Sequence, residues 1–232
     1  MTVPSITLNN GVEIPQLGFG VFQIKPEDTV EATLSALEVG YRHIDTAQMY
    51  GNEAEVGEAV RKSGIPRDEV FITTKLNNSF HAFDDALEAT DKSLERLGVE
   101  HVDLYLIHWP LPEVGDFVET WKAMEKIYAD GKARAIGVSN FQKHHLERLF
   151  AETEVVPAAN QIEVHPYLTQ NPLRAFDSEH NIATEAWSPI AQGDVLDDPV
   201  LKKIAEEKGR TVAQVVLRWH IQRGDIVFPK SV

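Results

Sequence analysis

The sequence predicts an α/β protein folded as a closed (β/α)8 TIM barrel, and three observations support this prediction. Eight short apolar segments alternate with helical patterns along the chain. Successive segments are separated by about one βα unit. Seven apolar runs end in polar or aromatic residues suited to an active site, which is typical of a barrel whose strand ends open onto one mouth. These runs end at Asp45, Lys75, His108, Ser139-Asn140, Gln161, Trp187-Ser188 and Lys230-Ser231.

A short hairpin precedes the predicted barrel. Residues 5–14 place apolar side chains on both sides of Asn10-Gly11. Asn-Gly is the strongest short-range hairpin signal, because both turn positions tolerate positive φ. We expect this β-hairpin to cap the closed, amino-terminal end of the barrel.

Strands and helices then alternate to the end of the chain. Helix boundaries are marked by turn residues, as where Pro26 opens the first helix and Gly40 ends it. Two helical patterns, 199–208 and 212–221, separate the last two strands. The expected strands cover residues 17–20, 41–44, 70–74, 102–107, 133–138, 158–162, 182–186 and 226–228.

Length and composition favour one domain over residues 1–232, because α/β barrels use this length as a single unit. The eighth strand ends shortly before Val232. We therefore expect the chain to be truncated after this strand, without the C-terminal helix and tail that would cover it. A final strand left uncovered would expose apolar surface.

The net charge and the amino-acid composition restrict the classes of partner and of chemistry that the protein can have. A formal net charge of −14 argues against a nucleic-acid partner, which favours a basic face. The chain has no cysteine, so it has neither disulfides nor a thiol nucleophile. The amino terminus lacks the pattern of a signal peptide, and no apolar run is long enough to span a membrane. We expect a cytoplasmic protein that acts on a small molecule.

Three of the strand-end residues, Asp45, Lys75 and His108, form a chemically coherent group with Tyr50, which lies in the loop five residues after Asp45. A free tyrosine has a pKa near ~10, and a neighbouring lysine cation should lower that pKa towards neutral pH. Asp45 would hold the lysine charged, and His108 would donate a hydrogen bond to a reacting carbonyl oxygen. Such a site protonates an oxygen while a second group delivers an electron pair, which favours a hydride donor as the partner.

The motifs that carry these residues resemble those of the aldo-keto reductase superfamily, in order and across essentially the whole chain. The branch that it resembles most is that of bacterial 2,5-diketo-D-gluconate reductase-like enzymes, because EAWSP places Trp187 where many relatives have tyrosine. The motifs are GYRHIDTAQMYGNE, TTKL, DLYLIHWP, AIGVSNF, NQIEVHP and FPKSV.

The resemblance implies a monomeric, NADPH-dependent reductase of aldehydes and ketones, including dicarbonyls and keto-sugar acids. Tyr50 would be the general acid, assisted by Asp45, Lys75 and His108, and no metal is expected. The substrate would contact His108, Phe22 and Trp109. The implied contacts to NADPH are Ser139, Asn140 and Gln161 at the nicotinamide, Trp187 stacked on it, and Ser188, Ala191, Gln192, Gly193, Lys230 and Ser231 along the rest of the cofactor.

The chain departs from the family pattern at two places. Asn77 follows TTKL where this branch usually has an aromatic residue, which predicts a wider and more polar mouth. The family's residues beyond the final Lys-Ser pair are missing, so the preference for NADPH over NADH rests on Lys230 and Ser231.

Two other functions remain open on the sequence. One is a metal-dependent hydrolase that uses His43, Asp45, His108 and His165, although these lack the paired-His spacing of a zinc site. The other is a cofactor-binding or sensing protein on the same barrel, without turnover. We expect His43, read as lying one position before the end of its strand, to point away from Asp45, and both His43 and His165 to be structural.

Overall fold

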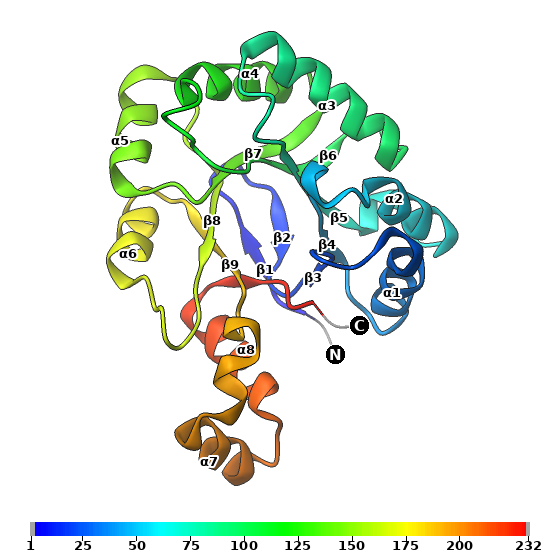
Figure 1. The fold of residues 1–232 in the computed structure, drawn as a ribbon, viewed down its shortest axis with the longest axis vertical. Coiled ribbons are helices and arrows are strands. Elements are labelled where there is room, and N and C mark those ends of the chain that lie inside the picture. Colours follow the sequence, from blue (N-terminus) through cyan, green and yellow to red (C-terminus); the bar gives the residue numbers. More distant parts are fainter. Residues whose placement is uncertain (1–2, 231–232) are drawn as a thin grey trace.

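The computed structural model of the chain describes residues 3–230, so the prediction for Ser231 lies outside the described residues. Eight parallel strands form the barrel (Figure 1). Each predicted strand is present, with its boundaries shifted by at most two residues. The strands are β3 (Phe19–Gly20), β4 (His43–Asp45), β5 (Phe71–Leu76), β6 (Val102–Ile107), β7 (Ala133–Ser139), β8 (Ala159–Glu163), β9 (Ala183–Trp187) and β10 (Ile226–Val227).

Backbone hydrogen bonds between the first and last strand segments close the barrel. Leu17 pairs with Val227 in parallel. The N–H of Gly18 donates to Val227 O at 2.8 Å, and the N–H of Val227 donates to Gln16 O at 2.9 Å. A Cβ on Gly20 would lie 2.8 Å from Phe228 O, so glycine allows this close approach. The predicted closed (β/α)8 barrel is confirmed.

The helices surround the strands in chain order, and α7 lies farthest from the barrel axis (Figure 1). Short 3₁₀ turns, η1 (Gln48–Tyr50), η2 (Arg67–Glu69) and η3 (Ala191–Asp197), join several of the elements. The helices are α1 (Pro26–Glu38), α2 (Glu53–Lys62), α3 (Phe83–Leu97), α4 (Phe117–Ala129), α5 (Lys143–Glu152), α6 (Asn171–Glu179), α7 (Pro199–Lys208) and α8 (Val212–Arg223). None of the helices in the described part of the chain has the length and hydropathy of a membrane span.

The sequence pattern did not predict α6. This helix has nine residues, and only Leu173, Phe176 and Asp177 are buried, so its apolar period is too short to detect. Pro172 in its first turn is a helix-start signal that the sequence offers.

The amino-terminal hairpin, β1 (Ser5–Thr7) and β2 (Glu13–Pro15), packs on the interior of the barrel. Ile14 and Leu8 are buried against Phe71, Leu104 and other inward side chains near the amino ends of the strands. The hairpin thus closes one end of the barrel, as predicted, and the opposite end is the mouth. A separate apolar layer packs between the outward faces of the strands and the helices.

Candidate active site

The carboxyl ends of β4 and β5 bring Asp45 and Lys75 together at the mouth. Asp45 pairs with Thr73 of β5, so Lys75 lies one pleat further along the neighbouring strand. The side chain of Lys75 is fully buried, and its Nζ donates to Asp45 Oδ1 at 2.7 Å and to Thr46 O at 2.9 Å. Burial lowers the pKa of Lys75, but Asp45 and Tyr50 together raise it above its usual value. Lys75 is therefore a buried cation with a fixed position.

Tyr50 ends η1, immediately after β4, and its hydroxyl lies 3.4 Å from Lys75 Nζ. Burial raises the pKa of Tyr50 above its usual value, while Lys75 acts in the opposite direction. The predicted effect of the lysine is present, but the prediction of a lowered pKa was wrong because desolvation of the phenolate is the larger effect. Tyr50 is thus held as a neutral hydroxyl, the form that can donate a proton.

Two side chains anchor the segment that carries Tyr50. Asn52 is fully buried, and its Nδ2 donates to Val21 O at 3.0 Å while its Oδ1 accepts from Thr46 Oγ1 at 2.8 Å. Gln48 Nε2 donates to Ala89 O of α3 at 2.7 Å. These bonds join the Tyr50 segment to the β3–α1 connection and to α3, which restricts its movement.

His108 follows β6 and lies beside Tyr50, with ring centroids 5.9 Å apart in an edge-to-face arrangement. Burial, together with the nearby Lys75 cation, lowers the pKa of His108 to about 3. The imidazole is therefore neutral at physiological pH. Its Nδ1 is buried and has no hydrogen-bond partner among the described residues.

A chain of hydrogen bonds links the residues that the resemblance assigns to the nicotinamide. Trp187 Nε1 donates to Asn140 Oδ1 at 2.9 Å, and Asn140 Nδ2 donates to His108 O at 3.0 Å. Ser139 Oγ donates to Gln161 O at 2.9 Å. Asn140 adopts a left-handed backbone conformation, with φ of 63°, at the end of β7. Four strand ends therefore contribute to one polar surface beside His108.

Gln161 connects this surface to Asp45. Its Nε2 donates to Asp45 Oδ2 at 2.9 Å and to Glu185 Oε2 at 3.3 Å. Glu185 is not among the site residues predicted from the sequence. Its place two residues before Trp187 gives it the same inward direction, which is the signal that would have found it. Glu185 is completely buried.

The segment after β9 has an unusual backbone. Ser188, Ala191 and Gln192 have φ values of 47°, 49° and 54°, and Gly193 follows with 107°. Left-handed conformations of residues other than glycine are sparsely populated and cluster at ligand sites. These are the residues that the resemblance assigns to the outer part of the cofactor. Lys230 is exposed beyond β10.

The predicted substrate residues lie at the edge of the site. Phe22 is 55% exposed, and its ring lies 5.0 Å from that of Tyr50. Trp109, next to His108, is 41% exposed. Asn77 Oδ1 accepts the N–H of Ser79 at 3.1 Å, so its carboxamide is engaged in the turn after β5.

The histidines of the hydrolase hypothesis do not gather into a metal site. Within residues 3–230, no three His, Cys, Asp or Glu side chains are arranged to hold a metal ion. The orientation predicted for His43 was wrong. β4 includes both His43 and Asp45, and side chains two residues apart in a strand lie on the same face, so both face the interior. His43 Nε2 lies 3.0 Å from Thr73 Oγ1, and burial lowers its pKa to about 4. His165 contacts Glu163 at 3.3 Å, outside the Asp45 group.

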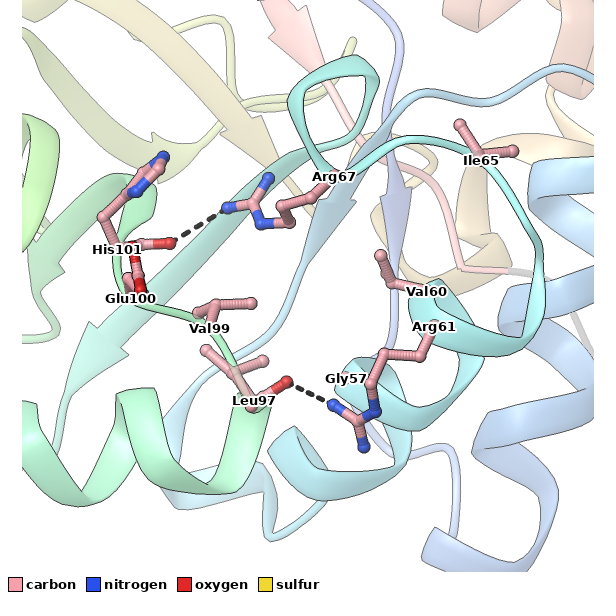
Figure 2. A pocket seen from close by; sticks show the side chains of 10 residues that line it. Gly57, Val60, Arg61, Ile65, Arg67, Leu97, Val99, Glu100 and His101 are labelled. Carbon is pink, nitrogen blue, oxygen red and sulfur yellow. Dashed lines mark hydrogen bonds between the residues drawn. The ribbon is translucent and has the colours of Figure 1, made fainter.

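A cavity of about 430 Å³ lies away from the mouth, between α2 and α3 near the amino ends of the strands (Figure 2). Arg61 donates across it to Leu97 O at 2.8 Å, and Arg67 donates to His101 O at 3.1 Å. Both arginines are thus used in joining neighbouring segments.

Comparison with known proteins connects this geometry to a family. The model of the Aldo/keto reductase family matches residues 16–232. An aldo-keto reductase of Mycolicibacterium smegmatis is 56% identical over 229 residues, which are 99% of this chain and 83% of that protein. Methylglyoxal reductase DkgA of Escherichia coli is 48% identical, over 98% of this chain and 82% of its own length.

The fold of the chain also matches solved structures of this family. A solved structure of a Gox0644 mutant in complex with NADPH superposes with a TM-score of 0.96 at 46% identity, over 100% of this chain and 84% of that one. The predicted family resemblance is therefore confirmed by sequence and by structure.

Proposed function

Because the chain belongs to the aldo/keto reductase family of enzymes, we propose that it reduces small α-dicarbonyl compounds and keto-sugar acids with NADPH, and that Tyr50 is the general acid. The observation that carries this proposal is the buried Asp45–Lys75 pair with the Tyr50 hydroxyl 3.4 Å from the ammonium and His108 beside it. DkgA of Escherichia coli, named a methylglyoxal reductase, supports the dicarbonyl class.

In the proposed reaction, Tyr50 transfers its hydroxyl proton to the carbonyl oxygen of the substrate as that oxygen gains negative charge. Lys75 stabilises the phenolate left behind, because an ammonium held in a water-excluded site interacts strongly with a nearby anion. Asp45 keeps Lys75 in place. His108, neutral at physiological pH, orients the carbonyl oxygen by donating a hydrogen bond.

The residues at the mouth fit a nicotinamide cofactor, which when bound supplies the hydride to the carbonyl carbon. Gln161 uses its amide group to reach two carboxyl groups, and none of the residues from 3 to 230 donates a hydrogen bond to its Oε1. Oε1, Ser139 and Asn140 thus provide donors and acceptors for a carboxamide. The indole of Trp187, fixed by its bond to Asn140, offers a flat surface for the ring.

The choice of NADPH is supported by the Gox0644 complex and by the exposed cation of Lys230. We also propose that the protein acts as a monomer in the cytoplasm. Light scattering of the purified protein tests the first part of that statement, and fractionation of cells tests the second.

Tyr50→Phe tests the proposed function. Turnover of methylglyoxal should fall by about 100- to 10,000-fold, because the proton donor is lost. The dissociation constant of NADPH, measured by quenching of tryptophan fluorescence, should change little. If the parent protein binds NADPH but reduces no dicarbonyl or keto-sugar acid, the sensing function is favoured instead. Equal turnover in the parent and Tyr50→Phe would show that another group donates the proton.

A further inference from the structure

Glu185 is a carboxyl group inside the barrel that the proposed reaction leaves without a role. It lies on β9, directly opposite Gln161 of β8 and Ile226 of β10 in the strand register. The residue has no solvent exposure, and its Oε1 has no hydrogen-bond partner among the residues described. A buried carboxyl group without a full set of partners costs stability, which favours a functional reason for its presence.

The contacts of Gln161 suggest that reason. Its Nε2 carries two hydrogens and lies within hydrogen-bond distance of two acceptors, Asp45 Oδ2 at 2.9 Å and Glu185 Oε2 at 3.3 Å. Asp45 is ionised, because its Oδ1 forms the buried pair with Lys75. Only the amide nitrogen of Gln161 can therefore face this side, and the carboxamide oxygen points away from Asp45 and Glu185.

The charges around Glu185 determine its protonation. Asp45 and Lys75 are the titratable groups that act on it, and their charges balance each other in the buried pair. An ionised Glu185 would leave one unbalanced negative charge in the interior. Burial, followed by the Asp45 charge, raises the pKa of Glu185 to about 8, against the smaller effects of Lys75 and the bond from Gln161. Glu185 is thus a neutral acid at neutral pH, and one of its oxygens accepts from Gln161.

We propose that Glu185 is a positioning residue for the cofactor: as an uncharged acceptor it fixes the Gln161 carboxamide so that Oε1 is presented to the carboxamide of a bound nicotinamide. This inference rests on the proposed function. An apolar residue at position 185 would fill the same space, but it would leave Gln161 with the hydrogen bond to Asp45 alone, so the plane of its carboxamide would be less restricted. Asp45 would still hold Lys75, so the proton donor would be unaffected.

The test compares Glu185→Gln with Glu185→Met in the full chain. Glutamine keeps an acceptor oxygen for Gln161 without a charge, whereas methionine has similar length and no acceptor. Fluorescence titration with NADPH should give a dissociation constant within about threefold of the parent value for Glu185→Gln. The constant should rise about tenfold for Glu185→Met, the size expected for loss of one buried hydrogen bond. The KM for NADPH should rise in parallel, and kcat should stay within about threefold.

Asp177→Asn is the matched control. Asp177 is also completely buried, with a pKa raised to about 7, chiefly by burial, but it contacts Asn160, not Gln161. Its substitution should change thermal stability without changing NADPH affinity. Equal affinity in the parent and Glu185→Met would overturn the positioning role, as would equal weakening in Glu185→Gln. Failure of the parent protein itself to bind NADPH would instead overturn the proposed function.

Discussion

Asp45 and Asp103 are two of the carboxylates in this barrel that face cations, and their ion pairs differ in how much they are exposed to water. At the mouth, Asp45 pairs with Lys75, whose side chain is completely buried. Near the amino ends of the strands, Asp103 accepts from Arg67 and Arg134, each at 2.8 Å. Those arginine side chains are 27% and 46% exposed. We name these the mouth pair and the outer cluster.

The outer cluster and the mouth pair also differ in the groups that they contact. Asp103 also accepts the N–H of Ile72 at 2.8 Å, so both of its oxygens are used to join β5, β6 and β7. The mouth pair instead lies beside reactive groups: the Tyr50 hydroxyl is 3.4 Å from Lys75 Nζ, and the Nδ1 of the neighbouring His108 has no partner in the described chain. A buried cation costs desolvation but acts strongly on a neighbouring hydroxyl, whereas a half-exposed cation mainly stabilises the fold.

The largest effect is expected for Lys75→Met, which removes the cation of the mouth pair. Asp45 would remain as a buried and unpaired carboxylate, which costs about 3–5 kcal/mol of unfolding free energy. Turnover should also fall by about 100- to 10,000-fold. Urea unfolding and dicarbonyl reduction measure the two effects. Adding Asp45→Asn should restore most of the stability but not the turnover, and a double variant as unstable as Lys75→Met would contradict this explanation.

Asp103→Asn should have a smaller effect, confined to stability. The two arginines of the outer cluster can be solvated when the carboxylate is removed, so we expect a loss of about 1–3 kcal/mol. The kcat and KM values at 25 °C should match those of the parent, because the cluster lies at the opposite end of the strands from Tyr50. Glu119→Gln, which breaks an exposed pair with Lys122, is the control and should change stability by less than about 1 kcal/mol. A clear drop in kcat for Asp103→Asn would show that the two ends are coupled.

A pH series separates the neutral buried acids from both ion pairs. Burial raises the pKa of Glu185 from its ordinary value of 4.5 to about 8, and that of Asp177 from 3.8 to about 7. Each acid therefore adds stability that is complete below its unfolded pKa and is lost as the pH rises through the folded value. The unfolding free energy should fall between about pH 5 and pH 8, by at most about 1.4 kcal/mol per pH unit for each proton.

Glu185→Gln and Asp177→Asn should each flatten this decline, as followed by urea unfolding at several pH values. Parent and variant slopes that coincide would mean that these carboxyl groups ionise normally in the folded protein.

The smallest expected effect concerns His108 at the mouth. Its pKa of about 3, lowered by burial and by Lys75, keeps it neutral in both the acidic and the neutral range. The profile of kcat/KM should therefore change by less than about twofold between pH 5.5 and pH 7. A limb near pH 6.5 that disappears in His108→Gln would show that the imidazole titrates normally and would weaken the electrostatic contrast between the two ends.

The sequence by itself determined the order of the elements and the strand ends that carry polar residues. Short apolar runs and helical patterns with turn residues place all eight strands within two residues, because these signals depend on neighbours in the chain. Closure of parallel strands then predicts that Asp45, Lys75 and His108 share one mouth. The pattern failed for α6, where a short helix buries only three side chains.

The tertiary structure decided what burial does to those residues. Glu185 is an ordinary acid in the sequence, and only contacts from β4 and β8, distant in the chain, place it beside Asp45 and Gln161. The same holds for Tyr50, whose pKa rises because desolvation exceeds the attraction of Lys75. Protonation states depend on the field and the solvent exclusion of the whole barrel, and local sequence carries little information on either.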